Sequence, residues 1–145
     1  MKRTATGLGL IAFLMVLAGG SLTAQVGEQP KDTDYTEDAE DAIDDAEDED
    51  DEAKRRQYYE AGLTRAQLEI ADNPNNPLGH QLAAIAALGL EQYAEAGAHF
   101  DHAKELYPLY EFQDLPVREQ TWLDLYGVAS PLVSAGDYEG AAAVF

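Results

Sequence analysis

A repeated helical spacing is the feature that most constrains what this chain can fold into. Pro74 and Pro108 each end an apolar, helix-forming stretch, and they lie 34 residues apart. Before Pro108, apolar side chains recur at steps of three and four residues, which places them on one face of a helix. These side chains are Tyr93, Ala96, Phe100, Ala103 and Leu106. A third, incomplete copy begins near Tyr138. The spacing predicts pairs of helices that repeat along the chain.

A 34-residue period with this aromatic and alanine stripe resembles the tetratricopeptide repeat (TPR), a helix–turn–helix unit. The resemblance covers residues 53–145 and implies an all-α, TPR-like helical repeat solenoid of about two and a half repeats. We assign residues 53–72 to a partial repeat, 77–108 to a complete repeat and 117–145 to a truncated repeat. The partial repeat aligns with a second helix, so its first helix is expected to be missing.

The third repeat departs from the period in two places. An extra stretch rich in aromatic residues, 109–116, is expected to form a loop before the next helix. That helix is expected to run from about Val117 to Val133, and Pro131 should kink or shorten it because proline lacks the helical N–H donor.

The first 24 residues have the pattern of an export signal. A positively charged start precedes an apolar core from Gly7 to Ala18, and small residues precede Ala24. We therefore expect a signal peptide at residues 1–24 that is cleaved after Ala24, and a periplasmic or secreted protein. An uncleaved anchor is the alternative, although the apolar core is shorter than the roughly 20 residues that span a bilayer. After cleavage no stable membrane insertion is expected. The chain has no cysteine, so the exported protein must fold without disulfides.

Acidic residues dominate the next segment. The formal net charge is −19, and residues 32–52 hold 14 of the 28 Asp and Glu residues and no Lys or Arg. So dense a block of like charge predicts a disordered acidic linker over residues 25–52. The charge also argues against nucleic acid as a partner, because phosphate backbones repel it.

Candidates for chemistry in this sequence are few. His99 and His102 have a spacing that can place two imidazoles on one metal, but no third ligand is evident and both are expected to face solvent. The acidic segment lacks the turn glycine of a calcium loop. No nucleophile, phosphate-loop or metalloprotease motif is present. We therefore predict no metal site, no cofactor and no enzymatic activity.

Binding of a protein or peptide partner is the remaining prediction. In TPR proteins the first helices of successive repeats line a concave groove. Carried onto this chain, the resemblance implies a largely apolar groove lined by Gln81, Ile85, Leu88, Tyr126, Ser130 and Val133. The alternative is that these side chains pack against neighbouring helices. We expect a non-enzymatic, exported interaction scaffold, or else a docking module at the N-terminus of a larger exported enzyme or envelope assembly factor. The apolar run that ends at Phe145 is further expected to favour self-association.

Overall fold

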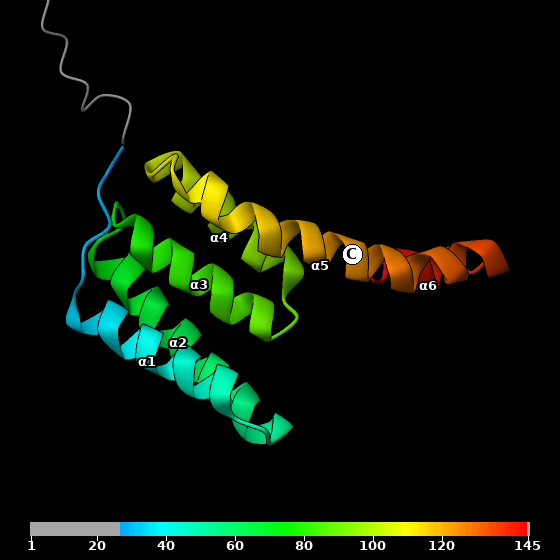
Figure 1. Cartoon of the computed structure of the whole chain (residues 1–145), viewed down its shortest axis with the longest axis horizontal. Coiled ribbons are helices and arrows are strands. Elements are labelled where there is room, and N and C mark those ends of the chain that lie inside the picture. The colour runs from blue at the N-terminus through cyan, green and yellow to red at the C-terminus, as the bar shows by residue number, and fades with distance from the viewer. Residues whose placement is uncertain (1–26, 145) are drawn as a thin grey trace, which may run out of the picture.

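The computed structural model describes residues 27–144, which form six helices and no strand (Figure 1). The all-α prediction is therefore confirmed for this part of the chain. The expected signal peptide at residues 1–24 lies outside the described residues. Successive helices pack as three pairs: α1 (Asp34–Asp48) with α2 (Glu52–Asp72), α3 (Pro77–Gly89) with α4 (Tyr93–Leu106), and α5 (Tyr110–Ala135) with α6 (Tyr138–Ala142).

The middle helices begin and end close to where the sequence predicts. The Asp51 side chain caps α2 by accepting a hydrogen bond from the Lys54 N–H. Asn76 caps α3 in the same way, and Pro77 occupies the first helical position, where the missing N–H has no helical partner to lose. Capping side chains thus fix the starts of α2 and α3 close to residues 53 and 77, where the repeat assignment places them.

The predicted disorder of residues 25–52 is wrong, because α1 occupies most of that segment. Thr33 caps α1 in a reciprocal pair with Thr36: each backbone N–H donates to the other side chain, at 2.8 and 3.2 Å. Small and apolar side chains then recur every three or four residues and are buried, while the carboxylates lie on the exposed sides. The buried side chains of α1 are Thr36, Ala39, Ile43 and Ala46.

Close packing holds α1 against α2. At Gly62 of α2, an added Cβ would lie 3.0 Å from Ile43 Cγ1 and 3.3 Å from the Ala39 carbonyl oxygen. The absence of a side chain at Gly62 therefore lets the two helices approach, and α1 buries its stripe despite its charge. The segment 53–72 is accordingly the second helix of a complete pair, and the first helix that we expected to be missing is α1.

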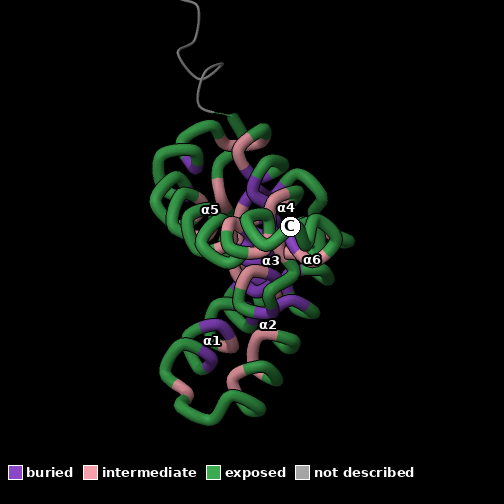
Figure 2. The backbone as a smooth tube through the Cα atoms, turned by 90° about the vertical axis from the view of Figure 1, so that its right-hand side faces the viewer, coloured by how far each residue is buried: buried purple, intermediate pink, exposed green. Residues whose placement is uncertain are grey.

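The main core runs through helices α1 to α4, with α3 packed between α2 on one side and α4 on the other (Figure 2). Helix α3 is buried on most sides through Leu82 and four alanines at 83, 84, 86 and 87. On α4 the predicted stripe is buried at its centre, since Phe100 is 2% exposed and Ala96 and Ala103 are also buried. The alanines of α3 allow both neighbouring helices to approach closely, which agrees with a helix packed on two sides.

A buried carboxylate connects the ends of three helices. Glu69 of α2 is fully buried; its oxygens accept hydrogen bonds from Thr33 Oγ1 at 2.6 Å and from Asn76 Nδ2 at 2.7 Å. Asn76 also pairs with the backbone of Lys31 through two hydrogen bonds. Further along, the Glu28 N–H donates to the Leu106 carbonyl. The segment before α1 is therefore attached to the helical body.

The third pair differs from its prediction. No loop forms at residues 109–116; instead α5 is one helix that begins at Tyr110 and continues through Pro116 and Pro131. Pro131 does not shorten it, and α5 ends where Gly136 takes a left-handed conformation at φ 79°. The far half of α5 and the short α6 extend beyond the other helices (Figure 1). Within residues 27–144, every helix is too short or too polar to pass through a bilayer.

Candidate functional site

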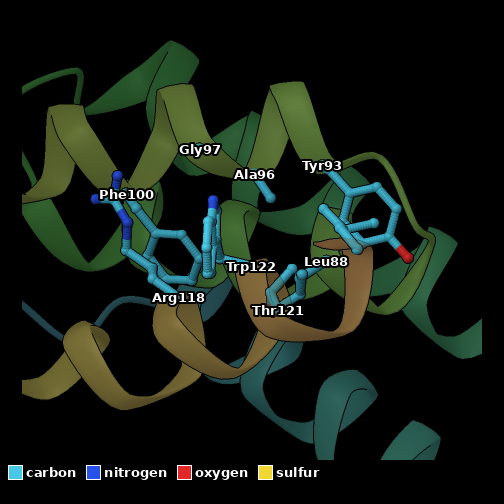
Figure 3. A pocket seen from close by; sticks show the side chains of 9 residues that line it. Leu88, Tyr93, Ala96, Gly97, Phe100, Arg118, Thr121 and Trp122 are labelled. Atoms are coloured by element: carbon cyan, nitrogen blue, oxygen red, sulfur yellow. The ribbon is translucent and has the colours of Figure 1, made fainter. Parts of the chain in front are cut away.

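An apolar cavity of about 170 Å³ lies between α5 and the α3–α4 pair (Figure 3). Leu88 contributes from the end of α3, and the centre of α4 forms the wall that faces α5. Phe100 and Trp122 approach each other at one end, and Tyr93 lies at the other. The lining residues are Leu88, Tyr93, Ala96, Gly97, Phe100, Arg118, Thr121, Trp122 and Leu125.

Two further hollows continue this cavity. One of about 440 Å³ reaches Arg55 and Tyr59 of α2, and one of about 640 Å³ reaches Val144 after α6. All three hollows share Tyr93 and Leu125. We call this continuous depression between α5 and the α2–α4 body the α5 groove.

Charged side chains line parts of the α5 groove, among them Arg118 in the apolar cavity and Arg55 in the hollow toward α2. The Arg118 guanidinium donates to Asp101 Oδ1 at 2.8 Å and lies 5.9 Å from the centre of the Phe100 ring. Burial raises the pKa of Tyr93, and the nearby carboxylates Glu91 and Asp124 raise it further. The Tyr93 hydroxyl therefore stays protonated and can donate a hydrogen bond at neutral pH.

The outer surface of α5 exposes large apolar side chains along its length. Trp122 is 55% exposed and stacks on Tyr126, with ring centres 5.3 Å apart and planes at 15°. The other exposed apolar side chains of α5 are Phe112, Leu115, Val117, Leu123, Val128 and Val133. A helix with so many exposed apolar groups presents a surface of the kind that binds another molecule.

Two of the predicted groove residues of α3, Gln81 and Leu88, face α5, but they meet different residues from those expected. Gln81 Nε2 donates to Asp114 Oδ1 at 2.6 Å. Leu88 lines the groove opposite Thr121, and Ile85 is half-buried against the core. Ile85 therefore agrees with the alternative expectation, in which these side chains pack against neighbouring helices.

The predicted groove residues of α5 lie further along that helix. Tyr126 and Val133 are exposed and Ser130 is half-buried, and none of the three lines the α5 groove. The structure therefore does not bring the two predicted sets together.

Sequence reasoning missed Trp122 and Leu125 because of the assumed offset between repeats, and it missed the α4 wall because it assigned the groove to first helices alone. The offset used was 45 residues, whereas Gln81 meets Asp114 and Leu88 lies opposite Thr121, both 33 residues on. Helix α5 likewise begins 33 residues after α3. A constant 33-residue period, without an inserted loop, would have identified Asp114, Arg118 and Thr121 instead.

Two buried oxygens between α3 and α5 lack partners. Asp114 is 2% exposed, and its Oδ2 has no hydrogen bond; the same is true of Gln81 Oε1. Burial raises the pKa of Asp114, although the Gln81 hydrogen bond and the Arg118 charge partly oppose this shift. A proton on Asp114 would give this pair a donor for the unpaired amide oxygen.

The three histidines lie together beside the α3–α4 contact. His80 is buried, and its Nδ1 lies 3.3 Å from His99 Nδ1. The prediction that His99 faces solvent is wrong, since its side chain is 21% exposed, whereas that of His102 is 51% exposed. The ring centres of His80 and His102 are 4.3 Å apart.

No protein-family model, curated protein or solved structure matches the chain.

Proposed function

We propose that this chain is an exported, non-enzymatic TPR-like scaffold whose α5 groove binds an amphipathic helix of a protein partner. The observation that carries the proposal is the apolar lining of the groove beside the exposed aromatic side chains of α5. A partner helix with apolar residues at three- and four-residue steps would cover Trp122 and insert side chains toward Leu88 and Leu125. The residue types in the groove favour burial of apolar groups over recognition of an acidic peptide end.

The repeated pairing of helices supports a helical repeat architecture. Helices α1 and α2 pair as α3 and α4 do, and the starts of α3 and α5 keep a 33-residue spacing close to the TPR period. Repeat proteins of this kind bind partners along the surface that their successive helices form.

The alternative is that the groove docks this region onto the rest of a larger exported enzyme or assembly factor. The same apolar surface would then bind a segment of that assembly. Residues beyond Phe145, or a partner isolated with the protein, would distinguish the two functions.

The chain's single tryptophan, Trp122, provides a direct test. We would select binders from a displayed library of amphipathic helical peptides and titrate them while recording Trp122 fluorescence. A bound helix should shift the emission to shorter wavelength and reduce acrylamide quenching, because Trp122 is now 55% exposed. Leu125→Glu should remove binding by placing a charge in the apolar groove.

Phe112→Ser is the matched control. Phe112 is also an exposed apolar residue of α5, at 74% exposure, but it does not line the groove. Its variant should bind the same peptides with unchanged affinity, and far-ultraviolet circular dichroism should show that both variants remain helical. Peptides that still bind Leu125→Glu, or that leave the Trp122 emission unchanged, would contradict the proposal.

A further inference from the structure

A hydrogen-bonded pair of histidines connects the start of α3 to the middle of α4. His80 is 7% exposed, and its Nδ1 lies 3.3 Å from Nδ1 of His99. On the other side of the His80 ring, Nε2 lies 3.3 Å from the Pro74 carbonyl oxygen. A carbonyl oxygen only accepts hydrogen bonds, so His80 Nε2 carries a proton and donates to this oxygen.

The position of that proton determines the state of both rings. Neutral His80 keeps its lone pair on Nδ1, which therefore accepts a hydrogen bond from the Nδ1–H of His99. His99 Nε2 then has the other lone pair, and it faces Glu95 Oε1 at 4.0 Å. The pair thus consists of two neutral rings in opposite tautomers, with one hydrogen between them.

This hydrogen bond can remain after one proton is added but not after two. A proton on His99 Nε2 leaves the bond intact and faces the Glu95 carboxylate. The second proton has only His80 Nδ1 left to occupy. It would place two N–H groups of two cations opposite each other across the 3.3 Å contact. The bond must then break and the two rings must separate.

The surroundings of the pair disfavour added protons. Burial is the main cause that lowers the pKa of His80; His102, whose ring centre lies 4.3 Å away, and His99 lower it further, while the Pro74 hydrogen bond opposes the shift. Burial also lowers the pKa of His99, with Glu95 opposing the shift and His102 adding to it. Both rings of the pair are therefore neutral at pH 7.

Carboxylates on the surrounding helices interact with other groups. On α4, Glu105 Oε2 lies 3.5 Å from Nδ1 of the third histidine, His102. Glu69 of α2 accepts two hydrogen bonds at the helix ends, and Asp114 of α5 accepts one from Gln81. The carboxylates of α1 lie on the exposed sides of that helix. These groups therefore do not offset a positive charge on the buried ring of the pair.

We propose that the hydrogen bond between His80 and His99 is an acid-sensitive latch that holds the start of α3 against α4. The latch stays closed while the pair carries no added proton or one, and it opens when the pair takes up two. Because α4 also forms a wall of the α5 groove, opening should weaken peptide binding in acid. That consequence rests on the proposed function, whereas the latch itself can be tested on the protein alone.

Nitrogen NMR of the imidazoles tests the assigned tautomers in the unmodified protein. At about pH 7.5 we expect the proton of His80 on Nε2 and that of His99 on Nδ1. On acidification, the signal of the hydrogen between the two Nδ1 atoms should persist through uptake of the first proton and disappear with the second. A proton on Nδ1 of His80 at about pH 7.5 would overturn the proposal, and so would loss of that signal with the first proton.

The dependence of stability on pH gives a second test. Both folded-state pKa values lie below the value of about 6.5 in the unfolded chain, so the unfolded chain binds protons first and stability falls as pH falls below that value. For each such proton, the folding equilibrium constant decreases by up to about tenfold per pH unit. In urea unfolding between about pH 7.5 and about pH 5, His80→Gln and His99→Gln should therefore each lose less stability than wild type. The comparison cancels the effect of the carboxylates that all three proteins share.

His102→Gln is the matched control, because it removes a histidine of α4 that lies beside His80 but outside the hydrogen-bonded pair. It should keep both tautomers and the hydrogen between the two rings. Circular dichroism identifies any variant that fails to fold, and the tautomer test on the unmodified protein does not depend on the variants. An equal loss of stability in acid for wild type and for folded His80→Gln and His99→Gln would contradict the latch.

Discussion

At the scale of single residues, Asp114 is an acidic group in a place that disfavours its charge. It is almost fully buried between α3 and α5, and one of its oxygens has no hydrogen-bond partner. Gln81 donates to the other oxygen, yet its own carbonyl oxygen is also unpaired. The cationic side chains of Arg118 and Lys104 and the carboxylate of Glu111 surround the same hollow. A neutral, protonated Asp114 would be better satisfied here than a carboxylate.

Asp114→Asn should therefore stabilise the protein at neutral and higher pH. Burial raises the pKa of Asp114 above 3.8 in the folded state, so its contribution to stability increases as pH falls through the raised pKa and is lost as pH rises. The asparagine amide can donate to Gln81 at every pH. Urea unfolding should show the variant more stable by about 0.5–1.5 kcal/mol near pH 8, with a smaller difference near pH 4. A variant that is less stable than wild type near pH 8 would contradict the burial argument.

At the scale of elements, α1 shows how composition can conceal a helix. The prediction of disorder rests on charge, yet Ala39, Ile43 and Ala46 have the three- and four-residue spacing of a buried helix face. Neither the capping pair of Thr33 and Thr36 nor the close approach to Gly62 was predicted, and the close approach depends on which helix α1 meets. Tertiary packing therefore offsets the repulsion that composition correctly indicated.

Because added salt screens that repulsion, the protein should become more stable as the NaCl concentration rises. Like charges recur four residues apart on α1, and Asp32 and Asp44 add to burial in raising the pKa of Glu40. Each such pair destabilises a helix by about 0.2–0.5 kcal/mol, so screening several pairs should recover about 1–2 kcal/mol. We expect urea unfolding to show this gain between about 0.02 M and about 0.5 M NaCl, because the Debye length shortens over that range.

Neutralising part of the acidic face gives the control. Asp41→Asn with Asp44→Asn leaves the buried stripe intact and should reduce the salt dependence, while it raises stability at low salt. A wild-type protein that loses stability as NaCl is added would show that ion pairs such as Arg65 with Asp38, at 3.5 Å, outweigh the repulsion along α1.

Helix α5 shows the limit of a repeat alignment drawn from one sequence. The extra residues between the second and third copies predict an aromatic-rich loop at residues 109–116. They instead lengthen α5, which has 26 residues where α3 has 13. Pro116 is the seventh residue of α5, beyond the free N–H groups of the helix start, so α5 continues through it with one helical hydrogen bond fewer. Of the three α3 residues predicted for the groove, Leu88 alone lines it, and the predicted α5 residues lie further along that helix.

At the scale of the whole molecule, the chain consists of a four-helix body and a projecting pair. Helices α1 to α4 share a core in which α2 and α3 pack together, and Glu69 connects their ends. Helix α5 contacts this body mainly near its first half, through the Gln81 hydrogen bond and the groove lining, and α6 contacts α5 beyond it. The burial pattern agrees, because α5 is mostly exposed or half-buried (Figure 2). The periodicity predicted the paired helices, but not this unequal attachment, which depends on side chains that meet across pairs.

Hydrogen exchange should separate these two parts. Amides of α3 and α4 should exchange slowest, those of α1 and α2 at intermediate rates, and those of α6 and of α5 after Tyr126 fastest, because few buried contacts oppose their opening. A helical peptide bound in the α5 groove should slow exchange around Thr121 and Leu125 while leaving α1 unchanged. Mass spectrometry of peptic fragments measures each segment. Equal protection of α5 and α4 in the unbound protein would mean that the projecting pair opens only with the body, and the groove would then be a fixed part of one cooperative unit.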